Sequence, residues 1–385
     1  MKPIKILHIH QDYPDGSGYP YTKAVANLLH ASPSLDHFVV SINRTSNPFK
    51  VKVKTFEEGL SVVYFGIPLP FFYIFTLWIT HWLIVWALKS QQFDLIHGHK
   101  LTTEGYLAFM LSKKRGVPYI ISVRGGSDVH NSNRCKMHRP LFAKIFRQAK
   151  AVLWVSPWAK ATLCEHLGLD VQACHLFPNI CDIELKSPPA VSLETQTPHF
   201  ISVVNFSYYE RKGVLPLLDA FKQLSEQGFQ YKLDVYGYGD ESNKALVEHY
   251  CRQLELNNTV HFHGAIAQHA LRQRMVNATG LLLPSLNETF GMAYIEALSV
   301  GIPIVYMANT GVDGFFDEYD IGVRCQTQDV EALAQAVAIL AQQQSRFKAG
   351  LHTMWVNRYL ERFTATVIAQ DYNRLIQQVL QHESR

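Results

Sequence analysis

The sequence predicts two α/β domains, each a doubly wound, mostly parallel sheet of the Rossmann-like type, facing each other across a cleft. Three observations lead to this prediction. The chain has 385 residues, which is long enough for two domains. Short apolar runs alternate with helical segments along most of it. A proline-rich stretch at residues 187–198 separates two such series. We therefore expect a first domain over residues 1–190 and a second over residues 191–362.

The strands expected in the first domain are continuous apolar runs rather than alternating patterns. Runs of this kind, separated by helices, indicate a parallel sheet that is covered on both faces. A helix is expected over residues 22–30 from its apolar spacing, after a turn-rich loop at residues 12–18. The predicted strands are Lys5–His10, His37–Ile42, Phe93–His97, Tyr119–Val123 and Ala151–Val155.

The same alternation begins again after the proline-rich stretch. It predicts a second sheet of the same kind, with helices between its strands. The predicted strands are Phe200–Val204, Lys232–Tyr236, Val260–His263, Gly280–Leu283 and Ile304–Tyr306. The predicted helices are Val214–Gln227, Lys244–Leu254, Met292–Val300 and Val330–Gln344, with a last amphipathic helix around Phe363–Gln381.

Composition and charge narrow the class of protein. Apolar residues make up 48% and charged residues 18% of the chain, which is typical of a globular protein. The net charge of +4 is too small for a nucleic-acid-binding protein but suits an anionic small ligand or an acidic membrane surface. The six cysteines form no C-x-x-C pair, and the apolar run Ile6–Ile9 is too short for a signal peptide. We therefore expect reduced thiols and a cytoplasmic protein.

One segment, Leu69–Leu88, is almost wholly apolar and near the length of a membrane-spanning helix. Thr76, Thr80 and His81 interrupt the run, and its aromatic residues are typical of a membrane interface. Trp78, Trp82 and Trp86 recur every four residues, so they share one helix face. We favour a membrane-interfacial helix, or a helix buried in the fold or in a dimer, over a true span. Four lysines flank the segment: Lys50, Lys52, Lys54 and Lys89. Further basic residues follow along the chain: Arg134, Lys136, Arg139, Lys144, Arg147 and Lys150.

The strongest local signal is the segment Pro284–Ala297, which follows an apolar strand and opens a helix. Such a turn points free backbone N–H groups and the positive end of the helix dipole at one place, which suits a diphosphate. Glu288 lies just before the helix and Glu296 lies within it. Their carboxylates can accept hydrogen bonds from sugar hydroxyls. The alternative is an acidic turn that stabilises the helix, with Glu296 on the surface.

The spacing from Glu288 to Glu296 resembles the E-x7-E element of the family 4 retaining glycosyltransferases, which have the two-domain B-type fold (GT-B). Further segments resemble family motifs in the expected order along essentially the whole chain. They are Phe93–His99, Pro178–Asp182, Arg211–Ala220, Tyr236–Gly239, Val260–Gly264 and Ala297–Pro303. The resemblance also implies that the C-terminal helix, residues 363–385, crosses back to the first domain.

The resemblance implies roles for residues on the donor side. Glu296 would bind the ribose hydroxyls of the nucleotide, and Glu288 the hydroxyls of the donor sugar. The backbone N–H groups of Thr289, Phe290 and Gly291 would face the sugar and phosphates. Lys212 would pair with the diphosphate and stabilise its charge in the transition state. Gly237 and Gly264, at the ends of two strands, are further donor-site candidates.

The sequence departs from the family pattern at two places. Asn205 stands where the family often has an arginine, and Arg211 is the candidate to replace it. Gly125 stands where the family usually has a histidine, so Arg124 or the loop backbone is expected to act there. Gly16 and Gly18 resemble the family's first glycine loop, whose backbone could approach a phosphate closely; an ordinary turn is the alternative.

The implied activity is the transfer of a sugar from a UDP- or GDP-sugar to a glycan or lipid-linked acceptor in cell-surface polysaccharide, lipopolysaccharide or glycolipid synthesis. The alternatives are an epimerase or hydrolase on the same fold and a non-catalytic nucleotide-sugar-binding subunit. No cofactor or metal is expected, because there is no D-x-D motif and the pairs His8/His10 and His97/His99 have no third ligand near in sequence. The expected partners are the donor, the acceptor and the inner face of a membrane, with no nucleic acid.

Overall fold

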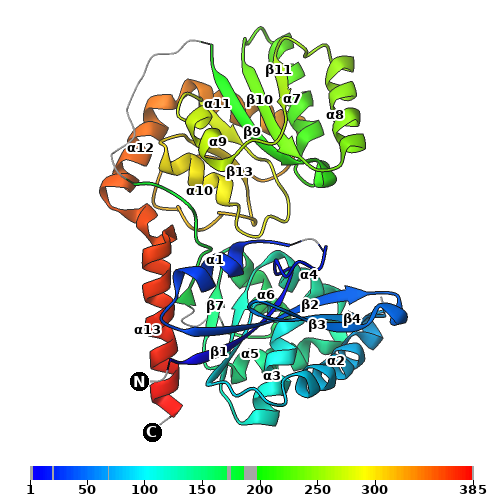
Figure 1. Ribbon diagram of the computed structural model, residues 1–385. Helices are drawn as coiled ribbons and strands as arrows, with labels where there is room; N and C mark the ends of the chain where they lie inside the picture. Colours follow the sequence, from blue (N-terminus) through cyan, green and yellow to red (C-terminus); the bar gives the residue numbers. More distant parts are fainter. Residues whose placement is uncertain (1–2, 20, 68, 171–174, 186–196, 384–385) are drawn as a thin grey trace. The chain divides into compact units, whose positions relative to one another are not determined.

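The chain divides into two compact α/β units (Figure 1). The first comprises Met1–Ile180 together with Ala365–Arg385, and the second comprises Cys181–Thr364. A computed structural model describes residues 3–19, 21–67, 69–170, 175–185 and 197–383. Most of the proline-rich stretch at residues 187–198, where the sequence places the domain boundary, lies outside the described residues.

The first unit contains an eight-stranded sheet in the order β3-β4-β2-β1-β5-β6-β7-β8. All neighbouring strands are parallel except β3 and β4, which form an antiparallel pair. These two strands and β8 were not predicted; β3 carries the lysines Lys52 and Lys54 on an exposed edge. The bounds are β1 Lys5–Gln11, β2 Asp36–Thr45, β3 Lys52–Phe56, β4 Gly59–Phe65, β5 Leu95–Gly98, β6 Tyr119–Val123, β7 Val152–Trp154 and β8 His175–Leu176.

Helices cover both faces of this sheet, as its continuous apolar strands require. One face packs Val25 of α1 and Ile376 of α13 against Ile6 and Leu95, and the other packs α2, α3, α5 and α6 against the opposite side. The helices are α1 Ala24–Ala31, α2 Tyr73–Ala87, α3 Glu104–Arg115, α4 Gly126–Arg134, α5 Arg139–Gln148, α6 Ala159–Leu167 and α13 Ala365–Glu383. The C-terminal helix α13 is therefore part of the first unit's core.

The second unit contains a six-stranded, wholly parallel sheet in the order β11-β10-β9-β12-β13-β14. Its strands are β9 His199–Asn205, β10 Lys232–Tyr238, β11 Val260–His263, β12 Gly280–Leu282, β13 Ile304–Met307 and β14 Gly322–Cys325. Its helices are α7 Val214–Glu226, α8 Glu241–Gln253, α9 Gln268–Met275, α10 Met292–Ser299, α11 Val330–Gln342 and α12 Gln344–Val356. Together the two units confirm the predicted fold class of paired doubly wound α/β domains.

Each sheet has a topological switch point near its middle. In the first unit the chain builds outward from β1 through β2 on one side, and later from β5 on the other side. In the second unit β9 continues to β10 on one side, and β12 starts the other side. Ligands of open α/β sheets bind where the loops leave the carboxyl ends of two such strands. The candidate sites therefore lie after β1 and β5, and after β9 and β12.

The apolar segment Leu69–Leu88 forms a short 3-10 turn, Pro70–Phe72, followed by α2. Leu77, Ile84 and Leu88 are buried in the first unit's core. The opposite face exposes Phe71, Phe75, Trp78, Ile79, Trp82 and Trp86. Pro70–Ala87 is long and apolar enough to cross a membrane by length and composition, yet only 28% of it is buried. A fully buried helix is thus excluded as the account of this segment.

Candidate functional site

The loops after β9 and β12 are joined to each other at the second switch point. Leu286 donates its backbone N–H to the carbonyl of Arg211 at 2.9 Å. Gly213 has φ +67°, and a Cβ at this position would lie 2.5 Å from the carbonyl oxygen of Pro284. Only glycine therefore allows the two loops to approach so closely. This approach brings Lys212 and Glu288, from loops 76 residues apart, into contact.

Lys212 and Glu288 form a partly buried ion pair, with Nζ 2.5 Å from Oε2. Ser285 donates its hydroxyl to the same carboxylate oxygen at 3.1 Å. Burial alone would raise the pKa of Glu288, but Lys212, Ser285 and Arg211 together hold that pKa below its ordinary value. The main chain of Glu288 is fixed as well, because its carbonyl accepts from the N–H of Gly311 at 2.8 Å. The site thus presents a fixed cation and a fixed carboxylate side by side.

Glu296 lies within α10 and is buried rather than on the surface, which excludes the surface position considered for it from sequence. Gln268 of α9 donates its side-chain amide to the Glu296 carboxylate at 2.5 Å. Burial raises the pKa of this carboxyl, although Gln268 and Arg272 oppose the rise. A buried carboxylate kept beside one amide donor suits hydrogen-bonding to neutral hydroxyl groups.

The N-terminus of α10 lies between these two carboxylates. Gly291 is the N-cap residue with φ +78°, a conformation that favours glycine. The side chain of Phe290 is 1% exposed and packs against the rings of Phe315 and Phe363. The side chain of Phe290 is therefore held in the core and is not available to a ligand, and the backbone contact predicted for residues 289–291 stays a prediction.

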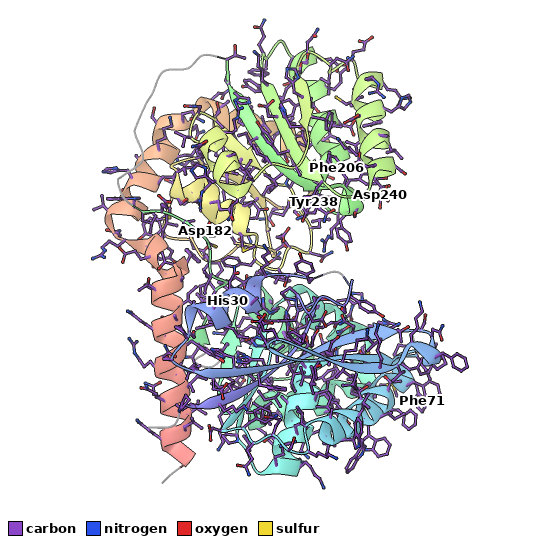
Figure 2. All side chains as sticks on the ribbon, in the orientation of Figure 1. His30, Phe71, Asp182, Phe206, Tyr238 and Asp240 are labelled. Atoms are coloured by element: carbon purple, nitrogen blue, oxygen red, sulfur yellow. The ribbon has the colours of Figure 1, made fainter. Side chains whose placement is uncertain are left out.

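The other donor-side candidates differ in the contacts that they make. Asn205 accepts the backbone N–H of Ser207 at 3.0 Å and so caps the turn Phe206–Tyr208. The guanidinium of Arg211 lies 4.9 Å above the ring of Tyr208. A Cβ on Gly237 would lie 2.3 Å from the carbonyl oxygen of Val204, so packing requires this glycine, whereas Gly264 has open space around it. Figure 2 shows Phe206, Tyr238 and Asp240 together where β9 and β10 end.

At the first switch point, the loop after β1 contains Gly16 and Gly18. Both have positive φ, +69° and +84°, and open space around their Cα atoms. Asp15 accepts the backbone N–H of Ser17 at 2.9 Å, which holds the turn between the two glycines. The loop therefore has the conformation that glycine favours and leaves room for a ligand.

Arg124, at the end of β6, is a buried cation. Its Nη1 donates to the side chain of Asn179 at 3.0 Å. Burial lowers the pKa of this guanidinium to about 10, so it stays charged at neutral pH. The next residue, Gly125, has φ +90°, and a Cβ there would lie 2.8 Å from the Trp158 ring. A histidine would clash at position 125, which explains this departure from the family pattern.

Sequence reasoning missed a cluster of buried charges beside Arg124. Lys100 lies 3.1 Å from Asp12 and 3.5 Å from the fully buried Glu104. Burial acts against the charge of Lys100, but Glu104 and Asp12 raise its pKa above the ordinary value. Asp128 accepts backbone N–H groups of Leu101 and Arg124, so it ties two loops together instead of capping α4. The signal was present in sequence, since Lys100 follows a strand at the switch point.

The two histidine pairs have no third ligand near in sequence, but the fold brings them together. Strands β1 and β5 pair in a register that puts His8 opposite His97, and one nitrogen each of His8, His97 and His99 lies within 4.8 Å of the others. Each ring has at least one nitrogen bonded to a protein group: His8 Nδ1 contacts His99 Nε2 at 3.0 Å, and His97 contacts Tyr372 and Ser122. The three rings are thus bonded to protein groups.

Comparison with known families agrees with this geometry. Residues 21–185 match the family described as Glycosyltransferase Family 4, and residues 186–352 match that described as Glycosyl transferases group 1. This chain belongs to the family 4 glycosyltransferases. The matches cover both α/β units, including the loops that carry Lys212 and Glu288, so the enzyme class predicted from the motifs is confirmed.

Three curated relatives of this glycosyltransferase have names that refer to polysaccharide synthesis. WcaL of Escherichia coli K12, named for colanic acid biosynthesis, is 25% identical over 58% of this chain and 55% of its own length. AmsK of Erwinia amylovora, an amylovoran biosynthesis glycosyltransferase, is 23% identical over 62% of this chain and 60% of its own. The O-antigen chain mannosyltransferase B of Escherichia coli is 22% identical, with 65% of each chain covered. The match thus spans less than two thirds of each relative.

Solved structures show the same fold over nearly the whole glycosyltransferase chain. Sucrose-phosphate synthase from Thermosynechococcus elongatus has a TM-score of 0.73 at 20% identity, covering 98% of this chain and 100% of that one. The lipopolysaccharide outer core galactosyltransferase WaaB has a TM-score of 0.70 at 18% identity, covering 97% and 99%. HepE from Anabaena, solved with UDP-glucose, has a TM-score of 0.65 at 17% identity, covering 97% and 100%. These similarities confirm the GT-B fold.

Proposed function

We propose that this glycosyltransferase moves a sugar from a nucleoside-diphosphate sugar to a glycan or lipid-linked acceptor, with retention of the anomeric configuration. The observation that carries the proposal is the Lys212–Glu288 pair, held at a topological switch point beside the N-terminus of α10. Relatives named for colanic acid, amylovoran and O-antigen chain synthesis favour a surface polysaccharide or lipopolysaccharide as the acceptor class.

The proposed roles of the donor-site residues follow from the charge of the diphosphate. Negative charge develops on the leaving nucleoside diphosphate as the glycosidic bond breaks. Lys212 and the N–H groups at the start of α10 stabilise that charge more in the transition state than in the ground state. Glu288 binds hydroxyls of the sugar, and its ion pair holds Lys212 in place before the donor arrives. Glu296, supported by Gln268, binds the ribose hydroxyls.

Retention is proposed through a front-face transfer. Glu288, the carboxylate nearest the proposed sugar position, is already bonded to Lys212 and Ser285, which leaves it a poor nucleophile. The bond from the anomeric carbon to the phosphate oxygen breaks, and the acceptor oxygen bonds to the same face. The acceptor proton passes to the released phosphate oxygen, so no protein base is required.

We propose further that α2 holds the enzyme against the inner face of an anionic membrane. The exposed face of α2 and of the turn before it is aromatic, with Phe71 of the turn 68% and Trp86 of the helix 65% exposed. Figure 2 labels Phe71 on this face. Lys114 lies over the ring of Trp82 at 5.5 Å, so a cation accompanies the aromatic face. Amphipathic aromatic rings favour the headgroup region, and each nearby basic residue adds about 1 kcal/mol at an anionic surface.

The test is acceptor-dependent release of the nucleoside diphosphate. A panel of UDP-, GDP- and ADP-sugars is first screened by thermal shift, where a ligand at about 100 times its Kd stabilises by roughly 2.7 kcal/mol. The selected donor is then incubated with lipid-linked and free glycan acceptors. Release that needs the acceptor supports the proposal. Release or epimerisation without an acceptor favours a hydrolase or epimerase, and binding without turnover favours a binding subunit.

A further inference from the structure

A chain of hydrogen bonds links three histidine rings through the core of the first unit. His37 Nε2 lies 2.9 Å from the backbone carbonyl of Ser32. His37 Nδ1 lies 2.9 Å from His8 Nε2, and His8 Nδ1 lies 3.0 Å from His99 Nε2. Burial lowers the pKa of His8 and His99 well below the ordinary value and lowers the pKa of His37 as well. All three rings are therefore neutral at physiological pH.

The carbonyl of Ser32 fixes the direction of every bond in this chain. A carbonyl only accepts, so His37 carries its proton on Nε2 and has a lone pair on Nδ1. His8 must then donate from Nε2, which leaves a lone pair on its own Nδ1. His99 must donate from Nε2 in turn. The chain therefore ends in one defined group, the hydrogen-bond acceptor His99 Nδ1.

That terminal acceptor is buried without a partner among the described residues. His99 lines a small cavity in the first unit. The volume open to the centre of a water molecule in this cavity is about 10 Å³. Arg124 lines the same cavity, and its Nε, which always carries a hydrogen, is also buried and unpartnered within the described chain.

The two unsatisfied groups are complementary to a single hydroxyl. A hydroxyl can donate to His99 Nδ1 while it accepts from the N–H of Arg124. A carboxylate or the ionised diphosphate of a nucleotide sugar could accept from Arg124 but has no proton to offer the histidine. The space matches one oxygen atom, since a water needs about 10–15 Å³ by this measure. Leaving both groups unpaired in the core would be costly, so the site favours an occupant of this kind.

We propose that His99 and Arg124 form a subsite for one hydroxyl group of a sugar, and that His8 and His37 are positioning residues that hold His99 in the tautomer this subsite needs. That the hydroxyl belongs to a sugar substrate rests on the proposed function; the direction of the histidine chain does not. The sugar has two possible sources, a donor still attached to its nucleotide and a sugar that carries none, such as an acceptor.

The experiment is NMR of the full-length protein with isotope-labelled histidine, which reports the protonation of each ring nitrogen. Free D-glucose, D-galactose and D-mannose form one arm; UDP-glucose, UDP-galactose and GDP-mannose form the second; UDP and GDP alone form the third. We expect His99 Nδ1 to be unprotonated and to shift saturably in one of the first two arms but not in the third. The signal of His352, exposed on α12 of the second unit, is the internal control.

Two conservative variants distinguish ligand binding from a structural role. His99→Asn places an amide atom near the Nδ1 position, and His99→Gln places one near Nε2, where the bond to His8 is made. A subsite at Nδ1 requires the Gln variant to lose at least about five-fold in sugar affinity and the Asn variant to lose less. A purely structural role predicts the reverse order, because Gln preserves the bond to His8.

His37→Phe tests the positioning residues, with exposed His30→Phe as its matched control. Without the Ser32 anchor, the other tautomer of His99 should become populated and sugar affinity should fall. A protonated Nδ1 in the wild type, or a His99 signal that no sugar moves, overturns the subsite. If instead sugars move His99 while no nucleotide sugar binds or reacts, the subsite stands and the proposed transferase activity fails.

Discussion

The two switch points use charge in different ways. In the second unit, Lys212 and Glu288 are partly exposed, and their pair lowers the pKa of the carboxyl. In the first unit, Arg124, Lys100, Glu104 and Asp128 are buried, and burial raises the pKa of Asp128 to about 6. A partly exposed ion pair can exchange its partner for an incoming anion more readily than a fully buried network, which mainly fixes geometry. The comparison therefore predicts chemistry at the second switch point and positioning at the first.

The largest effect expected from this comparison is at Lys212. Lys212→Ala removes the fixed cation that faces the leaving group, so kcat should fall by about 10²- to 10³-fold. Lys222→Ala, on the outer side of α7 with its partners Glu226 and Glu255, is the matched control and should change little. The measurement is initial-rate transfer with the donor found by thermal shift. A Lys212→Ala enzyme within three-fold of wild type would contradict the assignment.

Glu288 and Glu296 should separate into two roles. Glu296→Ala removes the partner of Gln268 and the proposed partner of the ribose, so donor affinity should weaken by about 5- to 150-fold. Glu288→Ala should lower kcat with a smaller change in donor affinity, because its partner Lys212 faces the reacting phosphate. Donor Kd from calorimetry and kcat from initial rates measure the two effects. Wild-type behaviour in both variants would remove these residues from the site.

Sequence predicted the second switch point well because its motif is local. Glu288, the helix start and Glu296 fall within nine consecutive residues, and the strand before them is apolar. The first switch point could not be predicted in the same way. His8 meets His97 only through the β1–β5 register, and Tyr372 reaches them from a helix 275 residues away in sequence. A pattern along the chain does not determine which strands pair, so the contacts among these histidines could not be predicted from sequence.

The buried network should also respond to pH. Since the folded-state pKa of Asp128 is raised, the folded protein holds a proton that the unfolded chain releases, and stability from this group is lost as pH rises from about 4 to 6. The difference corresponds to roughly 3 kcal/mol. Wild type should therefore lose stability relative to Asp128→Asn over this range in urea denaturation. A constant difference between the two proteins across the range would contradict the prediction.

A smaller effect is expected at α2. Replacing Trp78 and Trp82, each 44% exposed, by serine removes about 1 kcal/mol of interfacial burial per ring, so vesicle binding should weaken by about ten-fold or more. Leu246→Ser, at a similarly exposed apolar position on α8, is the control. The measurement is co-sedimentation with anionic vesicles at low salt. If folded wild type stays in the supernatant, a soluble acceptor becomes the better proposal.

Removal of divalent metal is expected to leave the transfer activity unchanged, which is the smallest effect predicted. The sequence has no D-x-D motif, and Lys212 already occupies the place where a cation would face the diphosphate. In the first unit, a metal at His8, His97 and His99 would have to displace one of the hydrogen bonds of His8, to His99 or to His37, and would add positive charge near Arg124. Transfer should continue unchanged in EDTA. Complete loss that magnesium or manganese restores would place a metal at the diphosphate and reduce Lys212 to a supporting role; loss restored only by zinc would point instead to the histidines.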